Sequence, residues 1–186
     1  MLRAWVESDP TATEPLSAYE MSTIEFLMAL YAIVAGLGVS LLVRSIGQII
    51  EARDRVRLYW VHSCWIALIF VAHVVSWFAL WRFLDHGPWT VMQSLLLLAV
   101  PILLYLISHL AVPELDDGRV HDLREYYYRH GQWMQGLLLA GLLSGSAAQI
   151  FIEGRPDFSG SGMVRTAMAL VLLPGIASRR PLVHSV

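Results

Sequence analysis

Two histidines stand in a strongly apolar segment of the chain, residues 60–77, which reads WVHSCWIALIFVAHVVSW. His62 and His73 are eleven positions apart, which is close to three turns of a helix with 3.6 residues per turn. Both should therefore lie on one helix face, together with Ile66, Ile69 and Ser76. An imidazole that faces hydrocarbon is costly, so we expect this face to point into a bundle of helices.

His73 lies near the middle of this segment, where a neutral, partnered imidazole is the expected state. The next apolar segment, residues 90–112, offers Tyr105, Ser94 and Gln93 as polar partners. We expect His73 to face that segment and to form an interhelical hydrogen bond with it. Because histidine changes its charge near neutral pH, His73, His62 and Tyr105 also support a hypothesis of proton or ion conduction or transport.

Three histidines fall at the same end of three successive apolar segments: His62, His109 and His130. Glu114, Asp116 and Asp117 follow His109 closely in the sequence. Neutral imidazoles with carboxylates suit a transition metal, and two facing histidines can ligate haem b. A metal- or haem-binding protein that uses His62, His109, His130 and Glu114 is therefore a further hypothesis. No cofactor is firmly implied, because none of the three histidines belongs to an HxxxH or HxxE pair.

The composition indicates a polytopic membrane protein. Of the 186 residues, 56% are hydrophobic and only 15% are charged, whereas about 25% charged residues is typical of soluble domains. The charges are concentrated between long apolar runs. The single cysteine, Cys64, has no partner for an internal disulfide. The sequence therefore predicts an all-α integral membrane protein, a polytopic helical bundle.

Four apolar segments have the length of about 20 residues that a bilayer crossing requires. A fifth segment is short and is interrupted by Pro174 and Gly175. We expect a polar N-terminal tail at residues 1–23, a bundle at 24–178 and a short C-terminal tail at 179–186. The expected spans are 24–43, 59–81, 90–112, 133–152 and the short segment 163–177.

Arginine, the only basic residue besides histidine in this chain, is distributed unevenly between the loops. The loops 44–58 and 113–132 are the richest, with Arg44, Arg53, Arg55, Arg57, Arg119, Arg124 and Arg129. Cytoplasmic loops carry the excess of positive charge. We therefore expect these two loops in the cytoplasm, the N-terminus outside, and a location in the inner membrane of a bacterium. In the loop 113–132, Asp122 and Glu125 resemble a capping box, which predicts a short surface helix.

Small residues recur every fourth position in two of the spans. The first span has Ala32, Gly36 and Ser40, and the fourth has Gly136, Ala140 and Ser144, with Gly141 and Gly145 on the adjoining stripe. Such faces allow helices to approach each other closely in lipid. The spacing leaves open whether these faces pack within the chain or against a partner.

The sequence contains no GxSxG, HExxH, phosphate-binding or dinucleotide motif, and it has no basic surface typical of nucleic-acid binding. We expect a small multi-pass membrane protein that works as an accessory, structural or assembly subunit of a larger membrane complex. Its expected partners are the lipid bilayer and other membrane subunits or further copies of itself, without nucleic acid. Conduction through His73, and metal or haem binding, are the alternatives.

The expected topology can be tested by labelling of introduced cysteines. In a Cys64→Ala background, a cysteine at position 55 should resist an impermeant thiol reagent added to intact cells and react after permeabilisation, because the loop 44–58 is expected inside. A cysteine in place of Asp85, on the opposite side, should react without permeabilisation. Ready labelling at position 55 in intact cells would contradict this orientation.

Overall fold

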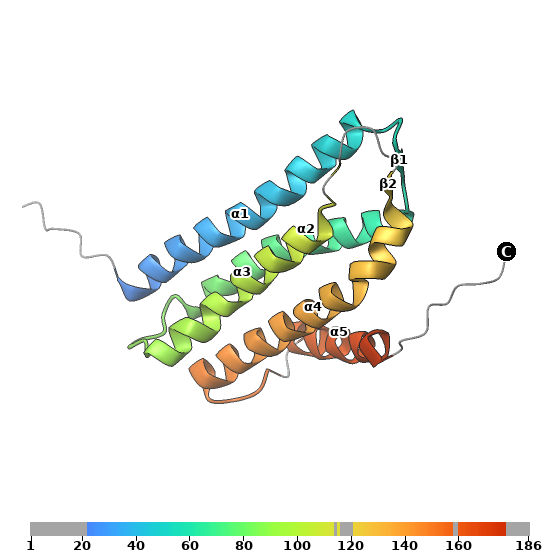
Figure 1. Cartoon of the computed structure of the whole chain (residues 1–186). Coiled ribbons are helices and arrows are strands. Elements are labelled where there is room, and N and C mark those ends of the chain that lie inside the picture. Colours follow the sequence, from blue (N-terminus) through green and yellow to red (C-terminus); the bar gives the residue numbers. More distant parts are fainter. Residues whose placement is uncertain (1–21, 114, 116–120, 158–159, 178–186) are drawn as a thin grey trace, which may run out of the picture.

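The computed structural model describes residues 22–113, 115, 121–157 and 160–177. These residues form five α-helices, a single 3₁₀ turn and one pair of very short strands (Figure 1). The helices are α1 (Thr23–Glu51), α2 (Trp60–Ala79), α3 (Val91–Ala111), α4 (Leu123–Glu153) and α5 (Gly160–Ala177); the 3₁₀ turn η1 (Leu80–Phe83) continues α2. The strands are β1 (Val56–Arg57) and β2 (His121–Asp122). The described part of the chain is thus a helical bundle, as expected.

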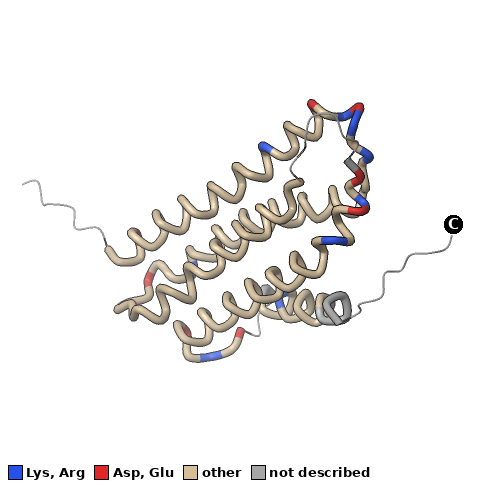
Figure 2. The backbone as a smooth tube through the Cα atoms, in the orientation of Figure 1, with Lys and Arg blue, Asp and Glu red and all other residues tan. Residues whose placement is uncertain are grey.

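Four of the described helical segments are long and apolar enough to cross a bilayer: α1, α2 with η1, α3 and α4. Helix α5 is the short fifth segment expected from the sequence, and it is not among them. Figure 2 shows that most charged residues lie at the two ends of the bundle, with tan helices between them. The expected terminal tails fall outside the described residues, except for positions 22 and 23.

Polar side chains fix the ends of three helices. Ser22 and Glu25 form a capping box at the start of α1, and Thr90 and Gln93 form another at the start of α3. Asp122 caps α4 by accepting hydrogen bonds from the backbone N–H groups of residues 124 and 125. These contacts satisfy donors that have no partner within the helix. Gly154 ends α4 with φ of 70°, a conformation that favours glycine.

The short surface helix expected after Asp122 is the first part of α4, which continues without a break through the expected span 133–152. The ion pair between Glu125 and Arg129, four positions apart, is present at 2.7 Å. Helix α1 likewise continues to Glu51, beyond the expected end of the first span at residue 43. Neither extension contains a proline, so the backbone hydrogen bonding is not interrupted there.

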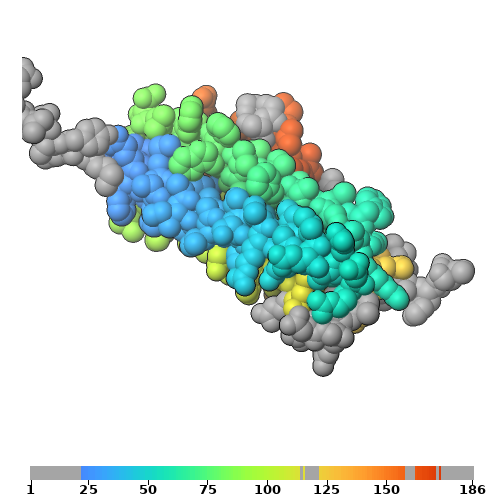
Figure 3. All heavy atoms as spheres, turned by 90° about the horizontal axis from the view of Figure 1, so that it is seen from above, coloured from blue at the N-terminus to red at the C-terminus, as the bar shows by residue number. Residues whose placement is uncertain are grey.

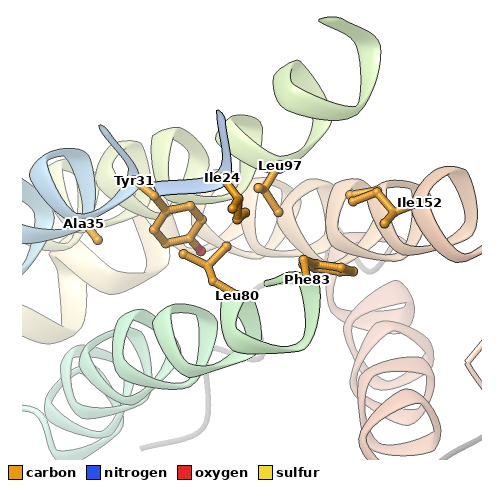
Figure 4. Close-up of a cluster of buried hydrophobic side chains, with 8 residues drawn as sticks. Ile24, Tyr31, Ala35, Leu80, Phe83, Leu97 and Ile152 are labelled. Atoms are coloured by element: carbon orange, nitrogen blue, oxygen red, sulfur yellow. The ribbon is translucent and has the colours of Figure 1, made fainter. Parts of the chain in front are cut away.

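Helix α3 is the centre of the bundle, because it packs against α1, α2 and α4. Helix α5 lies against α4 (Figure 1), and α2 makes only slight contact with α4. Two buried apolar clusters lie between the helices. The first, near η1, consists of Ile24, Tyr31, Ala35, Leu80, Phe83, Leu97, Ala148 and Ile152 (Figure 4). The second consists of Leu42, Ile66, Ile69, Leu104, Ile107, Ala111, Met134 and Leu138.

The loops 44–58 and 113–132 meet at one end of the bundle. Strands β1 and β2 pair in parallel there, with Val56 opposite His121 and Arg57 opposite Asp122. Val56 is buried. The two loops richest in arginine therefore lie side by side, and they must be on the same side of any bilayer that the helices cross.

Tyr126 holds the same end of the bundle together. Its hydroxyl oxygen lies 3.0 and 3.1 Å from the carbonyl oxygens of Leu110 and Val112, so its single proton is shared between these two acceptors. These carbonyls belong to the end of α3, where the last turn leaves acceptors without helical partners. Nearby, the indole N–H of Trp65 donates to the Tyr127 hydroxyl at 3.0 Å. These two tyrosines connect α4 to α3 and α2.

Removing the Tyr126 hydroxyl should destabilise this end of the bundle. We expect Tyr126→Phe to lower the free energy of unfolding by about 1–2 kcal/mol, because partly buried carbonyl groups at the end of α3 lose their donor. Tyr105→Phe is the matched control, since the described residues give Tyr105 no hydrogen bond, and it should change stability by less than about 0.5 kcal/mol. Chemical unfolding of the purified variants measures both. Equal effects of the two changes would contradict a specific role for Tyr126.

Candidate functional site

His73 is buried at 2% exposure between α2 and α1. Its Nδ1 lies 2.9 Å from the carbonyl oxygen of Ile69, one turn earlier in α2. A carbonyl can only accept, so Nδ1 carries the proton in this contact. Nε2 points at the backbone of Gly38 in α1 and has no hydrogen-bond partner among the described residues. A Cβ atom added to Gly38 would collide with it.

The expectation that His73 faces α3 is therefore wrong: its ring packs on α1, and its hydrogen bond stays within α2. Two of the expected partners on α3 bond elsewhere. Ser94 donates to the carbonyl of Thr90 at 3.1 Å, and the Gln93 amide donates to the carbonyl of Phe151 at 3.1 Å. The absence of a side chain at Gly38 lets the imidazole approach the α1 backbone.

His62 shares the buried face of α2 with His73, Ile66 and Ile69, as the spacing predicts. It is fully buried, and neither of its ring nitrogens has a hydrogen-bond partner among the described residues. The edge of its ring meets Tyr126 at a centroid distance of 5.8 Å. On the α2 face, the buried residues between the two histidines are apolar. Helix α2 therefore supplies no buried polar side chain between His62 and His73 that could connect them, as the hypothesis of proton conduction through His73, His62 and Tyr105 would require.

The three histidines of the metal or haem hypothesis differ in their surroundings. His62 is buried, His109 is exposed on α3, and His130 is half-buried, with Nδ1 3.1 Å from the Tyr126 carbonyl oxygen. Among residues 22–113, 115, 121–157 and 160–177, no three His, Cys, Asp or Glu side chains lie close enough to hold a metal ion. Glu114, Asp116 and Asp117 lie outside the described residues. The described part of the donor set therefore does not support this hypothesis.

Helical drift explains the exposure of His109. Each step of four residues turns about 40° beyond a full rotation. Along α3, Pro101 is buried, Tyr105 is half-buried and His109 is exposed. Residues spaced four positions apart thus move from the buried to the exposed face of the helix within two steps.

The small residues predicted to pack lie in two different settings. On α4, added Cβ atoms at Gly141 and Gly145 would lie 3.9 and 3.7 Å from Leu103 and Val100 of α3, and Ser144 donates to the carbonyl of Leu96 at 3.2 Å. Gly136 and Ala140 are half-buried on α4. On α1, Ala32 is half-buried, whereas Gly36 and Ser40 are exposed. An added Cβ at Gly36 would meet no atom within 4 Å.

A charged cluster near η1 was not predicted from the sequence. Arg82 lies 3.1 Å from Glu153 and 3.3 Å from Asp157, and Arg165 of α5 lies 3.6 Å from the same oxygen of Asp157. The Asp157 side chain is only 5% exposed. Arg165 also donates to the Gln149 side chain. The cluster joins η1, α4 and α5, and no short spacing in the sequence could reveal it.

An apolar groove begins beside this cluster. It has a volume of about 540 Å³ and lies between α2 and α4, with α3 as its floor and α5 along one side. Leu97, Val100 and Leu104 line the floor. We call it the α2–α4 groove.

Comparison of the chain with protein-family models, curated proteins and solved structures finds no significant match.

The contact between Gly38 and His73 can be tested by a matched pair of glycine substitutions. Gly38→Ala should lower the free energy of unfolding by about 1–3 kcal/mol, because the added methyl group overpacks a closed site. Gly36→Ala, two residues away in open space, should leave stability unchanged or raise it by up to about 1 kcal/mol through helix propensity. In a His73→Ala background, the cost of Gly38→Ala should disappear. Equal effects of the two glycine changes in the otherwise unaltered protein would contradict the contact.

Proposed function

We propose that the protein is a multi-pass integral membrane protein of the bacterial inner membrane and serves as an accessory or assembly subunit of a larger membrane complex. Large apolar side chains on the outer surfaces of its four long helices support the membrane location. Ile33, Val75, Leu95 and Leu143 are examples, one from each helix, and all are exposed. Soluble proteins rarely expose apolar surface of this extent, whereas lipid favours it.

The proposed orientation places β1 and β2 in the cytoplasm and η1 outside. The parallel pairing of the two strands supports it, because this pairing brings the two loops richest in arginine to one end of the bundle. Figure 2 shows blue segments gathered at that end. The orientation follows from the excess of arginine in cytoplasmic loops.

The outer face of α1 is the proposed contact surface for a partner subunit. We define this face by Ala32, Gly36 and Ser40. Figure 3 shows α1 in blue along one exposed side of the molecule, with α2 beside it. In a bilayer, lipid gives no hydrophobic drive for helices to associate, and small residues permit the close backbone contact that does stabilise association. The buried face of α1 already packs on α3 and α2, so its outer face is available to a helix of another subunit.

A bulky residue on this face should disrupt association without unfolding the protein. We expect Gly36→Leu to lose a stoichiometric partner after mild detergent extraction, because the side chain keeps the partner helix at a distance. Its thermal unfolding midpoint should stay close to that of the unaltered protein, since nothing lies within 4 Å of the added Cβ.

Ala67→Leu is the matched control, because Ala67 is an exposed small residue on α2. It should keep the partner in the same molar ratio. Retention of the partner by Gly36→Leu, or its loss in both variants, would show that the outer face of α1 is not the contact surface.

A further inference from the structure

The α2–α4 groove combines an apolar lining with two arginines, Arg82 and Arg165, at one end. Its sides come from α2, α4 and α5, and the rim residues Val71, Val75 and Val164 are exposed. The groove therefore opens sideways onto the helix surface. Figure 4 shows Tyr31, Leu80, Phe83 and Leu97, which line it near η1. Gly141 and Gly145 on α4 add no side chain to the space.

The length of the groove matches one leaflet of a bilayer. Its lining on α2 and η1 runs from Leu68 to Arg82, a distance of about 21 Å at 1.5 Å per residue. One leaflet contributes about 15 Å of a hydrocarbon core that is about 30 Å thick, and the headgroup region adds several ångström more. The charged cluster lies at the end of the groove that would face the headgroups.

The end of the groove near η1 presents guanidinium groups that can donate hydrogen bonds to an anion. Among the described residues that line the groove, only Arg82 and Arg165 are charged; Glu153 and Asp157 are not part of the lining. The contacts with these carboxylates and with Gln149 use Nε and Nη1 of Arg82 and Nη2 of Arg165. Within the described structure, the other three guanidinium nitrogens make no hydrogen bond. Guanidinium groups bind phosphate oxygens well, because their donors match the geometry of the anion.

We propose that the α2–α4 groove binds one phospholipid of the surrounding bilayer, with an acyl chain along the apolar lining and the phosphate against the guanidinium groups of Arg82 and Arg165. The volume of about 540 Å³ lies within the range of about 300–1,000 Å³ found for ligand pockets. Asp157 and Gln149 hold Arg165 in place, so the guanidinium groups are positioned before the lipid binds. The inference rests on the membrane location proposed above and does not require the partner subunit.

Native mass spectrometry of the delipidated full-length protein tests the proposal. Dioleoyl phosphatidylglycerol and dioleoylglycerol, which have the same acyl chains, are added separately. We expect one phosphatidylglycerol molecule to bind at least about tenfold more tightly than dioleoylglycerol, because only the former offers a phosphate to the two arginines. Equal binding of the two lipids, binding of neither, or a dimer that excludes lipid would overturn the proposal.

Two kinds of variant separate the contributions of the lipid's acyl chain and of its headgroup to binding. Gly145→Leu adds bulk to the α4 side of the groove, and Ala79→Phe adds bulk to the α2 side. Each should weaken binding of phosphatidylglycerol by about tenfold or more, because the larger side chain occupies the space of the acyl chain. Arg165→Gln should remove most of the preference for phosphatidylglycerol over dioleoylglycerol, and Arg165→Lys should retain part of it. If Gly145→Leu does not fold, Ala79→Phe decides, because Ala79 is exposed. Unchanged binding in a folded groove variant contradicts the site.

The outer-face variant keeps this test separate from the proposed function. Gly36→Leu should bind phosphatidylglycerol as the unaltered protein does, even where it loses a partner subunit, because Gly36 does not line the groove. Loss of lipid binding in folded Gly36→Leu would mean that the lipid binds outside the groove, and the site proposed here would be wrong.

Discussion

The packing of the His73 imidazole against the Gly38 backbone, with no side chain between them, brings α2 close to α1. The buried face of α2 is turned towards α1 and α3, and α2 therefore makes little contact with α4. Helix α4 packs instead on α3, through Gly141, Gly145 and Ser144. The α2–α4 groove is the space left between two helices that both pack on α3. The absence of a side chain at Gly38 thus allows α2 to pack closely on α1, and α2 also forms one side of the groove.

The two ends of the bundle are stabilised differently. At the end with β1 and β2, Tyr126 donates to carbonyl oxygens at the end of α3, and Tyr127 accepts a hydrogen bond from Trp65 of α2. The ring of Tyr126 lies between His62 and His130. At the end with η1, two arginines and two carboxylates connect η1, α4 and α5. Partly exposed ion pairs of this kind contribute little net stability. Arg82 and Arg165 also line the α2–α4 groove, and the contacts within the cluster hold these two side chains in place at its end.

The sequence predicted features that depend on spacing within one helix. The four long apolar helices and the buried face shared by His62 and His73 both follow from helical periodicity. Periodicity does not determine which neighbouring helix a face meets, so the expected partner of His73 was wrong. It also does not reveal contacts such as Arg82 with Asp157, which depend on tertiary packing. Repeats of four residues drift around the helix, and this drift accounts for the exposure of His109.

We propose that the outer face of α1 meets another subunit. The most direct measurement is photo-crosslinking in intact membranes from a photoreactive residue in place of Ser40, with the same residue in place of Ala67 on α2 as the control. We expect one protein adduct at position 40, with a polypeptide other than a second copy of this chain, and lipid adducts alone at position 67. Lipid adducts alone at both positions, or an adduct only with a second copy, would contradict it.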